Sequence, residues 1–254
     1  MLEVAKKATV LAGRKIVSLR KKGLTFKSKK RLGDIATDAD ITSEKIILAL
    51  LQKHFPNHNF ISEEAGKTDS GSEYTWLIDP LDGTIPYSSG LPIFGVSIGL
   101  LRNFQPQLGV VIMPDSGRLF WAERGKGAYM NGDRIAVSLE KDLINCVVGF
   151  DVPYIGTRSD AINRRLLHLA DKVRYPTMLG CASAGAVFVA SGILDAYLHS
   201  AHPWDYAAGA LIVSEAGGRV TDYRGNNIDW SKDWIDFFAS NGKIHDEILS
   251  LIKQ

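Results

Sequence analysis

Residues 76–84 read Trp-Leu-Ile-Asp-Pro-Leu-Asp-Gly-Thr, an apolar run that ends in two acids, a proline and a glycine. Pro80 has a fixed φ and no N–H, so the strand is predicted to stop there in a forced bend. Asp79 and Asp82 flank that bend, and both carboxylates can point at one place. Two such groups repel each other unless a cation lies between them. Oxygen ligands of this kind suit Mg²⁺, Mn²⁺ or Ca²⁺ better than zinc. An ordinary turn is the alternative.

The two residues after these acids suggest a second role for the segment. Gly83 permits close approach of the backbone to a ligand. The amides of Gly83 and Thr84 could bind phosphate oxygens.

Further acids could join this site. Glu63 and Glu64 follow a short strand at 60–62 and could meet Asp79 if the two strands are neighbours. Asp205 and Asp40 are predicted to be N-caps, because each stands at the start of a helical pattern. A surface position for the glutamates and a purely capping role for the aspartates are the alternatives.

The first half of the chain is predicted to combine two helices with a sheet. A helix at 2–20 ends at Gly23, a basic loop or hairpin follows at 24–33, and a second helix after Asp40 stops before Pro56. Short apolar runs predict an antiparallel meander with one buried face, extended by residues 131–137. Its strands are expected at 60–62, 74–79, 94–101, 108–113 and 118–123.

The second half alternates strands with helices. Strands are predicted at 145–150, 194–198, 219–223 and 235–240, and helices at 160–172, 183–192, 205–216 and 245–253. The change of pattern near residue 140 predicts two lobes, 1–140 and 141–254, within a single α/β fold.

Composition excludes several classes of function. The 254 residues are 45% apolar and 23% charged, with a net charge of +2. Such a balance gives no reason to expect nucleic acid or an anionic membrane as a partner. Cys146 and Cys181 have no metal-site spacing, and we expect a cytoplasmic protein without signal peptide or membrane span. His199 and His202 are interpreted as structural.

The motifs resemble the inositol monophosphatase family over essentially the whole chain. The resemblance rests on residues 63–64, 79–84, 204–209 and 215–218. It implies a layered αβαβα sandwich of the sugar-phosphatase type, with the active site between the two lobes. It also implies a lithium-sensitive, Mg²⁺-dependent phosphatase that acts on inositol 1-phosphate and fructose 1,6-bisphosphate and forms a homodimer or larger homo-oligomer.

The resemblance assigns roles to individual residues. Two or three Mg²⁺ ions, replaceable by Mn²⁺, would be held by Glu63, Asp79, Asp82, Asp205 and the Leu81 carbonyl. Thr84, bonded to Asp40, would orient the attacking water. Phosphate and sugar contacts are implied for Asp82, Gly83, Thr84, Gly180, Cys181, Ala182 and Asp205, and Lys29 falls in a basic loop.

The chain departs from the family pattern in two places. Ile85-Pro86 follows Thr84 where the family has Asn at the second position, and residues 198–203 lack an acid that binds inositol hydroxyls. Arg174 is therefore a candidate contact for the second phosphate of a bisphosphate sugar. Alternatives are a 3′-phosphoadenosine 5′-phosphate phosphatase, a histidinol-phosphate phosphatase, a non-catalytic phosphate-binding protein and a structural calcium-binding domain.

Overall fold

The computed structural model describes residues 1–22, 26–28, 35–152 and 155–252, so Gly23 and Lys29 lie outside the described residues. Within these ranges, strands form a two-stranded, an eight-stranded and a five-stranded sheet. The two-stranded sheet pairs β1 (Phe26–Ser28) with β2 (Ile35–Thr37). Helix α1 (Leu2–Lys22) precedes this sheet, and helix α2 (Asp38–His54) follows it.

The eight-stranded sheet has the order β10-β9-β8-β7-β6-β5-β3-β4. Its strands are β3 (Asn59–Ser62), β4 (Gly66–Thr68), β5 (Tyr74–Asp82), β6 (Gly95–Arg102), β7 (Gln105–Met113), β8 (Arg118–Glu123), β9 (Ala128–Met130) and β10 (Asp133–Ile135). The short helix α3 (Thr84–Ser88) follows β5 directly.

The five-stranded sheet has the order β12-β11-β13-β15-β14. Its strands are β11 (Val147–Phe150), β12 (Tyr175–Thr177), β13 (Ala196–Ala201), β14 (Arg219–Thr221) and β15 (Ile235–Ser240). The helical segments of this half are η1 (Leu143–Asn145), α4 (Arg158–Ala161), the π-turn η2 (Ile162–Leu166), α5 (Leu167–Ala170), α6 (Ala182–Ala190), α7 (Pro203–Glu215) and α8 (His245–Ile252).

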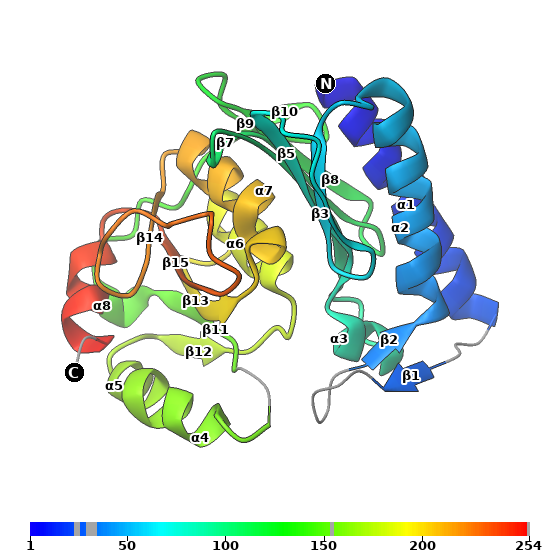
Figure 1. Ribbon diagram of the computed structural model, residues 1–254. Helices are drawn as coiled ribbons and strands as arrows, with labels where there is room; N and C mark the ends of the chain where they lie inside the picture. The colour runs from blue at the N-terminus through cyan, green and yellow to red at the C-terminus, as the bar shows by residue number, and fades with distance from the viewer. Residues whose placement is uncertain (23–25, 29–34, 153–154, 253–254) are drawn as a thin grey trace.

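The layers follow the order helix, sheet, helix, sheet, helix (Figure 1). Helices α1 and α2 cover one face of the larger sheet, and α6 and α7 lie between the two sheets. Helices α4, α5 and α8 pack outside the smaller sheet. The predicted αβαβα sandwich is therefore confirmed. The two sheets come from residues before and after 140, but a lobe boundary there stays a prediction.

The larger sheet differs from the predicted meander. It was expected to bury one face, yet β6 is buried from Gly95 to Leu101 because α7 packs on its second face. Cβ atoms added at Gly99 and Gly109 would come within 3.0 Å and 2.5 Å of α7. The glycines therefore permit the close packing of α7 against the sheet. The prediction also made every strand antiparallel, whereas β3 runs parallel to β5 because β4 takes the outer edge.

Pro80 does not end its strand, contrary to the prediction. Strand β5 continues to Asp82, with a shift of register against β6 between Asp79 and Asp82. The neighbouring β3 pairs with β5 only as far as Ile78, so the missing N–H of Pro80 leaves no partner in β3 unsatisfied. The proline thus lies in a bulge, which aims side chains away from the regular strand. Strands β4, β9 and β12 and the π-helical turn η2 were not predicted.

None of the described helices is both long and apolar enough to cross a lipid bilayer.

The C-terminal helix brings a histidine into the core. His245 is fully buried, with its ring nitrogens 2.9 Å from Thr221 Oγ1 and 2.8 Å from Ser240 Oγ. Burial lowers the pKa of His245 to about 4, and the nearby charge of Arg219 also lowers it. The ring is therefore neutral in the folded protein at pH 7.

We expect His245 to make the fold sensitive to acid. The unfolded imidazole binds a proton below about pH 6.5, whereas the folded one does so only below about pH 4, so stability falls as the pH drops between these values. Between pH 7 and pH 4.5 the loss from this group should be about 2 kcal/mol. Urea unfolding of wild type and His245→Gln at both pH values measures it. Equal losses in the two proteins would contradict the assignment.

Candidate active site

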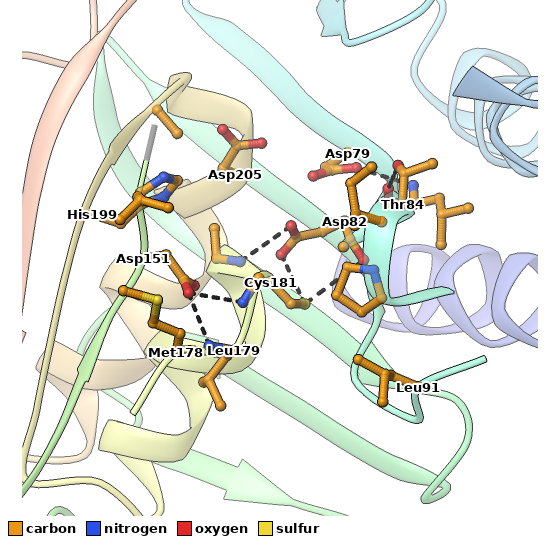
Figure 2. Close-up of a pocket in the computed structure, with 18 of the residues that line it drawn as sticks. Asp79, Asp82, Thr84, Leu91, Asp151, Met178, Leu179, Cys181, His199 and Asp205 are labelled. Carbon is orange, nitrogen blue, oxygen red and sulfur yellow. Dashed lines mark hydrogen bonds between the residues drawn. The ribbon is translucent and has the colours of Figure 1, made fainter. Parts of the chain in front are cut away.

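A cavity of about 440 Å³ collects most of the predicted site residues. Figure 2 shows the end of β5 on one side of it and the loop before α6 on the other. Ten predicted residues line it: Glu63, Asp79, Leu81, Asp82, Gly83, Thr84, Gly180, Cys181, Ala182 and Asp205. Residues from both halves of the chain therefore form one pocket.

The carboxylates of Asp79 and Asp205 form the acidic centre of this pocket. Asp79 is 2% exposed. Burial raises the pKa of Asp79 well above its usual range, and the charges of Glu63, Asp82 and Asp205 raise it further. Burial likewise raises the pKa of Asp205, together with the charges of Asp82 and Glu63. These acids repel one another in the absence of a positive charge.

The donor set fits a hard divalent cation. It contains carboxylate oxygens and the Leu81 carbonyl, and a cation among them would offset both the burial of these charges and their mutual repulsion, which together raise the two pKa values. The side chains do not form a finished cage: among the described residues, no three His, Cys, Asp or Glu side chains are arranged to hold a metal ion.

The carboxylate of Asp82 is hydrogen-bonded to the residues at the start of α6. Its Oδ1 accepts from the Ala182 amide at 3.2 Å, and its Oδ2 accepts from the Ser183 amide and from Cys181 Sγ. Burial raises the pKa of Asp82, while the hydrogen bonds from Ser183, Cys181 and Ala182 oppose that rise. The carboxylate thus faces the start of α6, across the pocket from β5 (Figure 2).

The hydroxyl of Thr84 is held between two acceptors. Thr84 Oγ1 lies 3.3 Å from Asp40 Oδ1 and 3.1 Å from the Leu81 carbonyl oxygen. The other oxygen of Asp40 accepts from the amide and the hydroxyl of Thr37, both at 2.7 Å. Asp40 is completely buried and contacts the pocket through the Thr84 hydroxyl. The two residues are therefore joined as the family resemblance implied.

Asp40 and Asp205 were both predicted to be N-caps, and both predictions are wrong in the same way. The N-cap of α2 is Thr37, and that of α7 is His202. Each aspartate is the third helical residue and accepts a hydrogen bond from the N-cap amide. The acid of a capping box reaches back in this way, so residue preference alone misplaced both helix starts.

Asp151 is a pocket residue that the sequence analysis missed. Its Oδ1 accepts from the amides of Leu179 and Gly180 at 2.9 Å and 2.8 Å, and its Oδ2 accepts from Tyr197 Oη at 2.6 Å. Figure 2 shows these bonds to the loop. Gly180 has φ +67°, which favours glycine. The position of Asp151 directly after a predicted strand was the available signal.

The residues that line the rest of the pocket differ from those expected from the sequence. His199, interpreted as structural, lines the pocket and bonds through Nδ1 to Tyr206 Oη at 2.5 Å. Arg174 is exposed and is not among the lining residues, whereas Arg158 and Trp234 are. The sequence pattern could not distinguish Arg158 from Arg174, because the path of the chain from β11 to β12 decides which of them reaches the pocket.

Cys181 is excluded as a nucleophile. Its thiol is buried, and burial together with the charge of Asp82 raises its pKa well above the usual range. A neutral thiol is a poor nucleophile.

The layered fold and its carboxylate-lined pocket define a sugar-phosphatase type of protein. The model of the inositol monophosphatase family matches residues 1–254, and the chain belongs to that family. Its members are phosphatases and are generally metal dependent.

Three similar proteins illustrate this membership. The fructose-1,6-bisphosphatase/inositol-1-monophosphatase of Aquifex aeolicus is 36% identical, with 100% of this chain and 95% of that protein covered. The inositol-1-monophosphatase of Synechocystis is 39% identical, with 97% and 86% covered. The crystal structure of the extragenic suppressor protein suhB from Bartonella henselae has a TM-score of 0.93 at 33% identity, with 99% and 98% covered.

Proposed function

We propose that this protein is a Mg²⁺-dependent phosphatase that hydrolyses the phosphate monoesters inositol 1-phosphate and fructose 1,6-bisphosphate. The observation that carries the proposal is the meeting of the Asp79 and Asp205 carboxylates with the Thr84 hydroxyl in one pocket. The names of the relatives from Aquifex and Synechocystis support the choice of substrates. Lithium inhibition, a homodimer and a cytoplasmic location are parts of the same proposal.

The residues of the pocket would have different roles in this reaction. Glu63, Asp79, Asp82, Asp205 and the Leu81 carbonyl would hold two or three Mg²⁺ ions, which when bound supply charge neutralisation and make a nearby water more acidic. The amides of Gly83 and Thr84 would hold phosphate oxygens. Thr84, polarised by Asp40, would orient the attacking water in line with the ester bond that breaks.

Phosphate release from three esters tests the proposal. Inositol 1-phosphate, fructose 1,6-bisphosphate and 3′-phosphoadenosine 5′-phosphate are each incubated with Mg²⁺, with Mn²⁺ and with a chelator. We expect release from the first two, none with chelator and less with lithium. No release from any ester would support a phosphate-binding protein without turnover.

The nucleotide phosphatase is the second candidate, because Trp234 and Arg158 line the pocket. An indole face and a guanidinium suit a base and a second phosphate, respectively. Faster release from 3′-phosphoadenosine 5′-phosphate than from the other two esters would establish this reading.

We expect Arg158 to discriminate between a bisphosphate and a monophosphate. Arg158→Ala should raise KM for fructose 1,6-bisphosphate about tenfold, the equivalent of about one charge-assisted hydrogen bond. KM for inositol 1-phosphate should change less than about twofold, since no second phosphate is lost. Steady-state kinetics with both esters measures the difference. Arg174→Ala is the matched control, and an equal effect of the two variants would contradict the assignment.

A further inference from the structure

Helix α2 places three buried polar side chains on one face, at positions 40, 43 and 44. Each of them bonds to a different segment of the pocket. Asp40 meets Thr84, and Ser43 Oγ donates to the Pro80 carbonyl at 2.6 Å inside the bulge of β5. Glu44 bonds to the turn that follows β3 and carries Glu63. Residues spaced by three and four lie together on a helix, so one rigid face contacts all three segments.

Glu44 accepts three hydrogen bonds with a single oxygen, all of them from the turn around Glu63. Its Oε1 accepts from the amides of Glu64 at 3.1 Å and Ala65 at 2.9 Å, and from the hydroxyl of Ser62. Glu44 is 5% exposed. These donors come from the two residues after Glu63 and the one before it, so the turn is held on both sides of Glu63.

A second contact fixes the same turn from the sheet. The Glu63 amide donates to the Ile78 carbonyl of β5 at 3.2 Å, one residue before Asp79. The backbone of Glu63 is therefore clamped between Glu44 and β5, and its side chain lines the pocket. Glu44 itself is not among the lining residues, and its hydrogen bonds connect it to the pocket through the turn.

We propose that Glu44 is a positioning residue, which aims the Glu63 carboxylate for binding of a divalent cation. The proposal rests on the proposed metal site. A carboxylate that only stabilises the fold is the competing explanation, because a buried acid with three donors contributes to stability in any location. The two explanations differ in what happens to cation affinity when the protein stays folded.

Mn²⁺ binding without substrate separates the explanations, with the ion titrated by the paramagnetic resonance of its free form. Glu44→Ala should raise the Kd for Mn²⁺ about tenfold or more, the range seen when a residue that orients a metal ligand is removed. Glu44→Gln should bind within about threefold of wild type, since its amide oxygen can accept the same bonds. Recovery in Glu44→Gln would show that the hydrogen bonds to the turn, and not the charge of Glu44, maintain the cation affinity.

Asp195 supplies the matched control. It is a buried acid that accepts from Ser138 Oγ and from the Val147 amide, and it does not line the pocket. Asp195→Ala should lower Tm but leave the Kd for Mn²⁺ unchanged. Where Glu44→Ala fails to fold, Glu44→Asp withdraws the acceptor by one methylene, and we expect weaker Mn²⁺ binding there too.

Two outcomes overturn the inference, and they are distinguishable. If wild type binds Mn²⁺, Asp79→Asn abolishes that binding and the folded Glu44→Ala or Glu44→Asp variant binds like wild type, the positioning role is wrong and the proposed function survives. If wild type binds no Mn²⁺, or Asp79→Asn binds it normally, the proposed metal site fails, and the positioning role fails with it.

Discussion

Asp79→Asn should lower the rate of phosphate release about 10²- to 10³-fold, the size of effect seen when one preorganised electrostatic group is lost from an active site. Asp79 lies at the centre of the acidic pocket, where the charges of Glu63, Asp82 and Asp205 act on it together. Asparagine has almost the same shape but no charge, so it should remove measurable cation binding with little change in packing. Single-turnover kinetics at a Mg²⁺ concentration that saturates wild type measures the loss.

The same variant should be more stable than wild type when both are free of metal. Folding raises the pKa of Asp79 above its unfolded value, so this carboxyl destabilises the folded protein increasingly as the pH rises above the unfolded pKa. Asparagine removes this penalty, and Tm in chelator at pH 7.5 should rise. Mg²⁺ should then raise the Tm of wild type but not that of the variant. Unchanged turnover in Asp79→Asn would refute the metal assignment outright.

Thr84→Val should produce the second large loss, about 10²-fold in kcat. Valine keeps the volume of threonine but removes the hydroxyl that lies within hydrogen-bonding distance of Asp40 and the Leu81 carbonyl. Assisted proton transfer typically contributes about 10²- to 10⁴-fold. Metal affinity should stay within about threefold, because the Thr84 hydroxyl is not one of the proposed ligands of the cation.

Thr84→Ser provides the matched control for this prediction. It keeps the hydroxyl and should retain kcat within about tenfold of wild type. A loss in Thr84→Val that appeared only in KM would assign the hydroxyl to substrate binding instead. Equal activity of the valine and serine variants would remove Thr84 from the mechanism.

Many features of the fold could be predicted from local sequence. Apolar spacing located both N-terminal helices and the central strands, because the periodicity of a helix or strand appears within a single segment. The acids on either side of Pro80 could also be identified from local sequence, because two carboxylates across a bend are a short-range feature. The family resemblance then linked them to Glu63 and Asp205.

The sequence predictions were wrong where a residue is compatible with two local structural roles. Asp40 and Asp205 look like N-caps, yet Thr37 and His202 take that position because the aspartates bond backwards to the N-cap amides. Pro80 looks like the end of a strand, yet β5 passes it because β3 needs no hydrogen bond from that position. In each case a neighbour in space or one turn away decided between the possibilities.

The sequence by itself determined the class of fold, the approximate positions of most helices and of the longer strands, and the acids that could hold a cation. Only the tertiary structure decided that Asp151, Arg158, His199 and Trp234 belong to the pocket and that Arg174 does not. It also decided that Glu44 holds the turn of Glu63. The physical reason is range: helix and strand patterns repeat within a few residues, whereas a pocket depends on how distant segments pack.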